Sequence, residues 1–156
     1  MAIKDKLVSK VVLQQLKPLA ISKYWLLIQQ NILEALGGQK ASEGSQVRLM
    51  SAIQAGTIQV WVALTADEER PTLVGMAFTR VIGDDLLGTR MLSIYGLNLK
   101  KILTDEEFSR CLGEIELYAK SIGCYAMHAQ TVWSGVNKLL EKNGYVAGPS
   151  VLIKEI

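Results

Sequence analysis

Few side chains in this chain of 156 residues combine a reactive group with a spacing that suits catalysis or metal binding. His128 is the single histidine, which excludes a multi-histidine zinc site within one chain and leaves one imidazole for a nucleophilic triad. Cys111 and Cys124 have no second cysteine at metal-ligand spacing, and two buried thiols are the simpler interpretation. Asp84 and Asp85 suit the polar tip of a hairpin. We therefore expect no metal site.

Ser93 and Tyr95 are candidates of another kind, because alternate residues of a strand face the same side and these two could line a cleft. Ordinary packing within a sheet is the simpler alternative for both. His128, expected at the end of a short strand, could take part in proton transfer or could merely cap that strand. No residue is therefore assigned firmly to catalysis.

The elements that must position these residues follow from hydrophobic periodicity. The expected ranges are a strand at 10–16, helices at 18–36 and 46–55, and strands at 58–64, 72–82 and 89–99. Short turns between the three later strands predict an antiparallel meander. The buried face of the first helix consists of Ile21, Trp25, Ile28, Ile32 and Leu36, and Gly37 with Gly38 ends that helix.

A clear start signal for a long helix stands at Thr104 and Glu107, which have the spacing of a capping box. Asp105 and Glu106 add negative charge at the positive end of the helix dipole. The expected elements from there on are a helix to residue 122, a strand at 124–129, a helix from 132 to Asn143, and a strand at 151–156. We expect residues 1–156 to form a single domain.

Composition limits the partners of such a domain. Hydrophobic residues make up 49% of the chain and charged residues 21%, with a formal net charge of +2 and no basic run, so nucleic-acid binding has little support. Apolar runs stay far below the roughly 20 residues that cross a bilayer, so we expect no membrane partner. The charged segment from Met1 to Lys6 is unlike a signal peptide, and we expect an intracellular, cytoplasmic protein.

Two segments in this order of elements resemble the GNAT superfamily of N-acetyltransferases. Residues 118–124 read Tyr-Ala-Lys-Ser-Ile-Gly-Cys, and residues 139–145 read Leu-Leu-Glu-Lys-Asn-Gly-Tyr, where the family commonly has Leu-Tyr-Glu-Lys-x-Gly-Phe. The resemblance covers almost the whole chain. It implies an α+β fold with a mixed, mostly antiparallel central sheet flanked by helices, in the order β-α-α-β-β-β-α-β-α-β.

The resemblance also implies an acyl-coenzyme A (acyl-CoA) site, in which two splayed strands receive the pantetheine arm and a glycine-rich loop before the long helix binds the pyrophosphate. This chain has no glycine from residue 98 to residue 112. Leu103 stands near the family's Arg or Gln, and Thr104, Glu106 and Phe108 stand near its glycines. Side chains and carboxylates at these positions disfavour a bound pyrophosphate.

A second departure concerns the general acid, which the family usually supplies as the Tyr of its Leu-Tyr-Glu-Lys segment. Leu140 stands at that position and has no proton to donate. Trp133 occupies the place where the family often has Asn. Tyr145 matches a family aromatic that usually belongs to the core, so it does not simply replace the missing acid.

Two hypotheses of different class follow. The favoured one is a GNAT-like domain without acetyltransferase activity and without a cofactor, which binds another protein or itself within a larger assembly such as a virus particle. Aromatic side chains that could lie at such an interface are Trp25, Trp61, Trp133 and Tyr24.

The alternative is a divergent N-acetyltransferase that uses acetyl-coenzyme A (acetyl-CoA) and acts on an amine. In that case we expect Lys100, Lys101 and Thr104 to contact the cofactor. Tyr95 or His128 would then take part in proton transfer.

Overall fold

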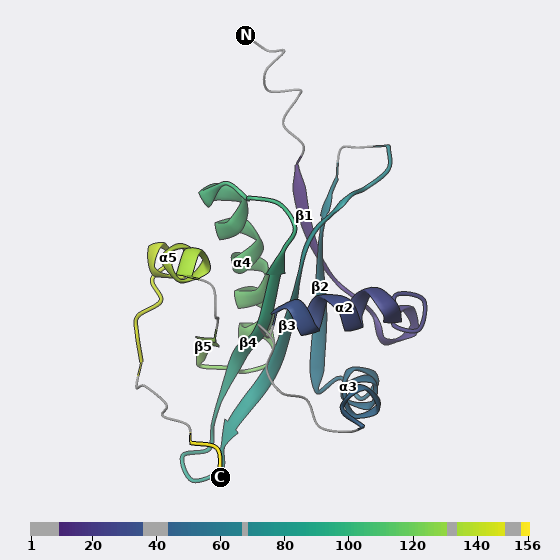
Figure 1. The fold of residues 1–156 in the computed structure, drawn as a ribbon. Coiled ribbons are helices and arrows are strands. Elements are labelled where there is room, and N and C mark those ends of the chain that lie inside the picture. The colour runs from purple at the N-terminus through teal and green to yellow at the C-terminus, as the bar shows by residue number, and fades with distance from the viewer. Residues whose placement is uncertain (1–9, 36–43, 67–68, 131–133, 149–153) are drawn as a thin grey trace.

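The computed structural model describes residues 10–35, 44–66, 69–130, 134–148 and 154–156 (Figure 1). The elements, in chain order, are β1 (Val11–Gln15), η1 (Pro18–Ala20), α2 (Trp25–Ala35), α3 (Ser45–Gln54), β2 (Ile58–Thr65), β3 (Leu73–Asp84), β4 (Thr89–Leu99), α4 (Asp105–Ser121), β5 (Ala126–Ala129) and α5 (Ser134–Lys142). Of the helices within the described residues, none has the length and apolar content needed to cross a bilayer.

A five-stranded sheet in the order β1-β2-β3-β4-β5 forms the centre of the fold. The first four strands are antiparallel neighbours, as the predicted meander requires, and β5 lies parallel to β4. A parallel pair needs a crossover connection, and α4 provides it between β4 and β5. The α+β class and the mixed, mostly antiparallel sheet are confirmed.

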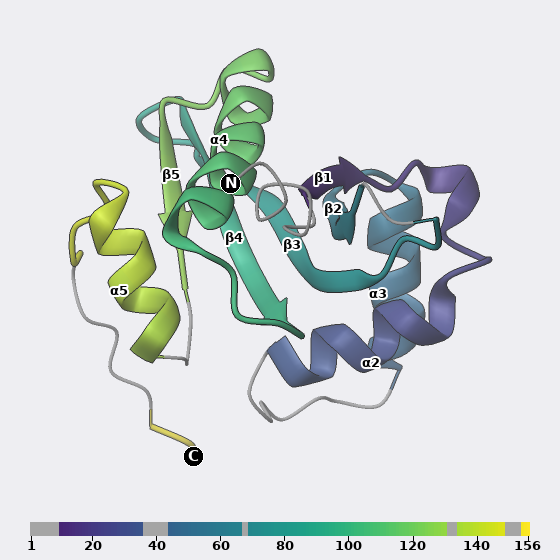
Figure 2. The same ribbon diagram turned by 90° about the horizontal axis from the view of Figure 1, so that it is seen from above.

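Helices cover both faces of the sheet (Figure 2). On one face α2 and α3 pack Ile28, Ile32 and Ile53 against β2 and β3. On the other face α4 packs against the sheet and α5 lies beside β5 (Figure 2), and Phe108 and Leu140 belong to this second core. The predicted buried face of the first helix is therefore confirmed for Ile21, Ile28 and Ile32, and Trp25 is partly buried.

Apart from shifts of one or two residues at other ends, the predicted element bounds differ from the structure at three places. The first helix is not continuous from residue 18, because a short 3₁₀ turn and further turns precede α2, with the Tyr24 amide donating to the Ile21 carbonyl (3.1 Å). The strand expected from residue 124 starts at Ala126, because the Cys124 amide donates to Ala119 at the end of α4 (2.9 Å).

The third difference concerns the ends of the last two elements. Helix α5 is described from Ser134, so the first predicted residues of that helix lie outside the described residues. The same holds for the stop expected at 37–38 and for residues 151–153 of the expected last strand. Residues 154–156 are described and have no regular secondary structure, so no strand is seen there.

Candidate functional site

The pairing of β4 with β5 is short and ends beside an irregularity in β4. The two strands pair only from Met91 to Ile94 on β4, and the Gln130 amide adds one more bond to the Ile94 carbonyl (3.2 Å). A β-bulge follows at once, because Phe78 pairs with Gly96 and Thr79 with Ile94, which leaves Tyr95 as the extra residue. Strand β5 ends at Ala129, opposite Ile94, so within the described residues no strand pairs with this edge of β4 beyond the bulge.

Candidate side chains from two strands meet beside this bulge. Ser93 and His128 are directly opposed, and Ser93 Oγ lies 2.9 Å from His128 Nδ1. Tyr95 lies under the guanidinium of Arg80, whose Cζ is 4.4 Å from the ring centroid. The structure therefore brings Ser93, Tyr95 and His128 to one region, and it adds Arg80, which the sequence analysis did not single out.

The N-terminus of α4 is closed by its own side chains. Thr104 Oγ1 accepts from the Glu107 amide (3.1 Å), and Glu107 Oε1 accepts from the Thr104 amide (3.0 Å), so the predicted capping box is confirmed. Three carboxylates lie in the first turn, from Asp105, Glu106 and Glu107. Asp105 Oδ2 also forms an exposed ion pair with Lys142 Nζ (2.9 Å).

Lys100, a candidate for phosphate binding, is paired with a carboxylate of α2. Its Nζ lies 2.7 Å from Glu34 Oε2, and Lys101 is exposed. Asn98 donates to the same oxygen (2.7 Å) and to Asn31 Oδ1 (2.9 Å). The hydrogen bond from Lys100, followed by that from Asn98, lowers the pKa of Glu34.

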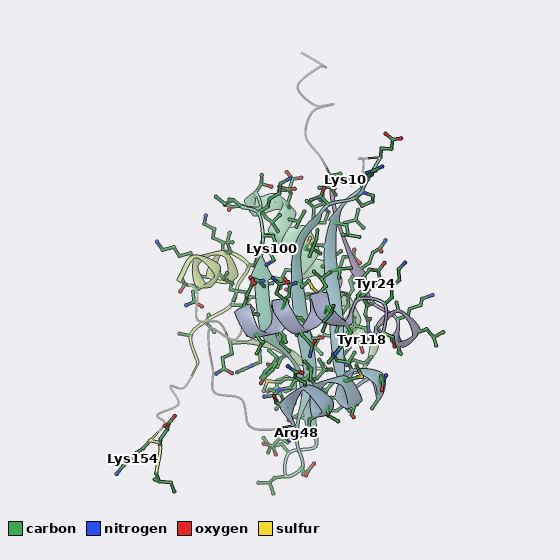
Figure 3. All side chains as sticks on the ribbon, turned by 45° about the vertical axis from the view of Figure 1, so that its right-hand side comes forward. Lys10, Tyr24, Arg48, Lys100, Tyr118 and Lys154 are labelled. Atoms are coloured by element: carbon green, nitrogen blue, oxygen red, sulfur yellow. The ribbon has the colours of Figure 1, made fainter. Side chains whose placement is uncertain are left out.

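This network joins the middle of α2 to the part of β4 beyond the bulge, and the sequence analysis missed it. Asn31 is fully buried, and its own amide group also donates to the Leu27 carbonyl (2.8 Å). The available signal was a polar Asn31 directly before Ile32 on the apolar face of a helix. Lys100 and Tyr24 lie near opposite ends of α2 (Figure 3).

The α5 helix places an apolar side chain where the resemblance expects a general acid. Leu140 is buried in the core between the sheet and α4. Tyr145 is half-buried, its hydroxyl lies 3.3 Å from Glu116 Oε1, and burial together with Glu116 raises the pKa of the phenol. His128 and Tyr145 both line a hollow of about 840 Å³ beside β5 and α5. Trp133 lies outside the described residues.

The two cysteines are half-buried rather than fully buried, which corrects the expectation of two buried thiols. Cys111 lines an apolar cavity of about 40 Å³ between the sheet and α4. Burial raises the pKa of the Cys111 thiol, which disfavours the reactive thiolate. Among the described residues, no group of three His, Cys, Asp or Glu side chains could hold a metal ion.

The expectation that the aromatic residues lie at an interface is wrong for Trp61. This side chain is 5% exposed, its Nε1 donates to Thr79 Oγ1 (3.0 Å), and Tyr118 packs against it edge-on with ring centroids 5.4 Å apart. Trp25 packs partly buried against the core under α2. Tyr24 is exposed, with Lys23 Nζ 5.3 Å from its ring centroid.

Comparison with known proteins identifies the fold. No protein-family model matches the chain, and no curated protein matches its sequence. Among solved structures, an aminoglycoside acetyltransferase from an uncultured soil metagenomic sample, in complex with sisomicin, has a TM-score of 0.68 at 14% identity, covering 94% of this chain and 95% of that one. An aminoglycoside N-acetyltransferase in complex with CoA has a TM-score of 0.67 at 13% identity, covering 96% of each chain.

A third similar structure is a GNAT family acetyltransferase from Staphylococcus aureus. It has a TM-score of 0.63 at 14% identity and covers 96% of this chain and 100% of that one. Likeness at such low identity concerns the arrangement of the elements and not the chemistry of a site. This chain has the fold of the GNAT superfamily of acetyltransferases.

Proposed function

We propose that this GNAT-fold domain has no acetyltransferase activity and acts by binding protein, as a component of a larger assembly such as a virus particle. The observation that carries the proposal is the closed N-terminus of α4. A helix start binds phosphate through its unpaired amides and positive dipole end. Here the Glu107 amide donates to Thr104 Oγ1, and the Glu107 carboxylate accepts from the Thr104 amide, so neither amide is left for a phosphate.

Charge at the same place also disfavours an anion. Each carboxylate about 4 Å from a phosphate charge costs on the order of 1 kcal/mol even at the dielectric constant of water, and α4 carries three in its first turn. Lys100 and Lys142 each already pair with a carboxylate. Exposed ion pairs of this kind contribute only about 0–1 kcal/mol to stability. The carboxylates and the cap at the start of α4 therefore disfavour a bound phosphate more than the two lysines favour it.

The general acid is the second support for the proposal. A thiolate leaving group needs a proton donor, and Leu140, at the position where the family usually has Tyr, is part of the core. Tyr145 is half-buried and its hydroxyl is directed to Glu116. This supports a scaffold in which α5 stabilises the fold and takes no part in proton transfer.

Calorimetric titration with acetyl-CoA and with free CoA at low salt tests the proposal. We expect no saturable binding at millimolar ligand. A variant with Asp105→Asn, Glu106→Gln and Glu107→Gln removes the three charges and keeps a side chain at position 107 that can complete the capping box. We expect this variant to bind CoA weakly, because the charge repulsion of the pyrophosphate is gone. Glu114→Gln, in the exposed middle of α4, is the matched control. Micromolar, stoichiometric binding by the unmodified protein would contradict the proposal.

A divergent N-acetyltransferase is the second candidate, and the bulge at Tyr95 favours it. Within the described residues no strand pairs with the β5-side edge of β4 beyond this bulge, which suits the backbone hydrogen bonds of a pantetheine arm, and His128 lies nearby as the candidate base. This candidate requires acetyl transfer from acetyl-CoA to an amine, and the transfer must be lost in His128→Ala. Protection of the fold against heating by acetyl-CoA would support it independently.

A further inference from the structure

The turn between β3 and β4 carries two exposed leucines. Leu86 is 93% exposed and Leu87 is 70% exposed. The turn is held in one shape, because the Leu87 amide donates to Asp84 Oδ1 (2.9 Å) and the Gly88 amide donates to the Asp84 carbonyl (2.8 Å). Gly88 has a φ of +64°, which glycine adopts without strain. A fixed turn thus presents both leucines to solvent, so little conformational entropy is lost when they bind a partner.

The same turn is acidic. Asp84 and Asp85 precede the leucines, and neither carboxylate forms an ion pair with the described part of the chain. Arg90, the first basic residue of β4, donates to the Ile122 carbonyl at the end of α4. Exposed leucines beside two carboxylates suit a protein surface that is apolar and basic, and they disfavour an anionic membrane surface. We call residues 84–88 the leucine tip.

A hollow of about 240 Å³ lies along β1, the strand at one end of the sheet order. Its apolar wall contains Val11, Leu13 and Cys111. A volume of about 150 Å³ is enough to hold a benzene molecule in a protein, so a leucine side chain fits into this hollow. We call it the β1 hollow.

The β1 hollow is basic where the leucine tip is acidic. Its charged residues are Lys10, Arg110 and Glu114, two basic and one acidic. Arg110 donates to the Val11 carbonyl (2.8 Å), which fixes the guanidinium beside the hollow, and it forms no ion pair with a carboxylate of the described residues. A guanidinium has five N–H donors, so Arg110 can also bind a carboxylate of another molecule.

The leucine tip and the β1 hollow lie at opposite ends of the long strands. Val11 pairs with Thr65 at the end of β2, beside the start of β3, whereas the tip follows the other end of β3. This strand has 12 residues and spans about 36 Å at roughly 3.3 Å per residue. In Figure 1 the two places are at the top and the bottom of the sheet. One chain therefore cannot place its tip in its own hollow.

We propose that the leucine tip of one copy of this chain binds in the β1 hollow of a second copy. Leu86 and Leu87 then contact the apolar wall, and the carboxylates of Asp84 and Asp85 face Arg110. The second copy is the partner because the acidic, apolar tip and the basic, apolar hollow are complementary and belong to the same chain. The contact joins two different surfaces, so it continues from copy to copy in a ring or an open chain. The inference rests on the proposed function, since it names the partner of a domain that binds protein within an assembly.

The size of the contact predicts weak association. A turn of five residues buries less than the roughly 800 Å² per partner of a standard interface. Sedimentation equilibrium of the whole chain, under reducing conditions, should give an average mass that rises above 17.2 kDa between micromolar and millimolar protein. A mass of 17.2 kDa over this whole range would overturn the inference.

The double variant Leu86→Ala with Leu87→Ala is the direct test of the tip. We expect it to weaken association by about 10-fold or more, because most of the apolar area that the tip buries is lost. Val47→Ala is the matched control, since Val47 is 71% exposed on α3, and it should leave association unchanged. Circular dichroism should show an unchanged fold for both variants. Unchanged association in the double variant would overturn the inference.

Arg110→Glu tests the hollow, because it places a carboxylate opposite the acidic tip. Arg110→Gln removes the charge and keeps an amide group that can donate to the Val11 carbonyl, so it separates the lost charge from the lost contact with β1. We expect both variants to weaken association, and Arg110→Glu to weaken it more. Association as strong as in the unmodified protein for both variants would overturn the role given to Arg110.

A mixture of variants tests the pairing of two different surfaces. The alanine double variant keeps an intact β1 hollow, and Arg110→Glu keeps an intact leucine tip, so the mixture can form one intact contact. We expect a complex of one copy of each, whereas each variant alone stays monomeric. No complex in the mixture would overturn the pairing of tip with hollow.

Failure of the inference and failure of the proposed function are distinguishable. A monomer at millimolar concentration, with no binding of acetyl-CoA, overturns the second copy as partner and leaves the proposed function in place. In that case the leucine tip would have to bind a different protein. Acetyl transfer by the protein overturns the proposed function, whatever its oligomeric state.

Discussion

Ser93 Oγ lies 2.9 Å from His128 Nδ1, so a side-chain hydrogen bond joins β4 to β5 at directly opposed residues. Ser93 is 2% exposed, and β5 pairs with β4 at only four residue positions. A hydroxyl can donate or accept, so the bond forms with either neutral tautomer of the ring. The pair therefore stabilises the attachment of β5 beside the bulge.

Ser93→Ala should lower the free energy of unfolding by about 0.5–1.5 kcal/mol, because it removes one partly buried hydrogen bond. Urea denaturation followed by circular dichroism measures this change. Ser121→Ala is the control, since the Ser121 hydroxyl bonds to the Tyr118 carbonyl at the exposed end of α4. We expect a smaller effect there, and equal effects at both positions would contradict the role given to Ser93.

Gly75 allows β3 to lie close to Asn98 and Leu99, in the part of β4 beyond the bulge. A Cβ at this position would lie 2.8 Å from the Asn98 carbonyl oxygen and 3.1 Å from Leu99 Cδ2. Gly75→Ala must therefore push the two strands apart, at a cost of about 1–3 kcal/mol of stability. Gly83→Ala in the same strand is the matched control, because nothing lies within 4 Å of its Cβ. Thermal unfolding should separate the two variants clearly, and an equal melting temperature would contradict the close approach.

Glu34 should make stability depend on pH in the acidic range. Its pKa is lowered from the usual 4.5 by the hydrogen bonds from Lys100 and Asn98. The folded protein thus favours the carboxylate, so the contribution is complete above pH 4.5 and is lost as pH falls through the lowered pKa. Below this pH, the urea midpoint of Glu34→Gln should depend less on pH than that of the unmodified protein. Glu114→Gln on α4 should leave this dependence unchanged. A midpoint with unchanged acid dependence in Glu34→Gln would be the contrary result.

Thr104→Ala should destabilise α4 by about 1 kcal/mol, because the Glu107 amide loses its acceptor. Thr104→Ser keeps the hydroxyl and should retain most of the stability. The free energy of unfolding measures both effects. If Thr104→Ser is as damaging as Thr104→Ala, the loss comes from side-chain packing and not from the cap.

Local features of this protein were predictable from the sequence because they depend on residues close together in the chain. The capping box joins Thr104 to Glu107, three residues away, and it is present as predicted. Alternation along β2 puts Val60 and Val62 on one side and Trp61 and Ala63 on the other, and the structure has the same arrangement. Alternation could not show that both sides are covered by helices, which is why Trp61 was misjudged as a possible interface residue.

The site depends on contacts between distant segments. Ser93 meets His128 across 35 residues, Lys100 meets Glu34 across 66 residues, and Asn98 meets Asn31 across 67 residues. Such pairs follow from the strand register and from the way α2 crosses the sheet. Neither of these can be predicted from the spacing of residues in the sequence. The bulge at Tyr95 is of the same kind, since it exists only relative to β3.

The sequence by itself determined the order of the elements as far as α5, the buried sides of the helices and strands, and the acidic, glycine-free start of α4, because periodicity, caps and charge act within one turn or one strand. Tertiary structure alone decided that Lys100 pairs with Glu34 and that His128 bonds to Ser93. It also decided that Leu19, Leu26 and Leu33 remain exposed. These outcomes depend on which surfaces the packed elements bring together or leave to solvent, and packing is a property of the whole chain.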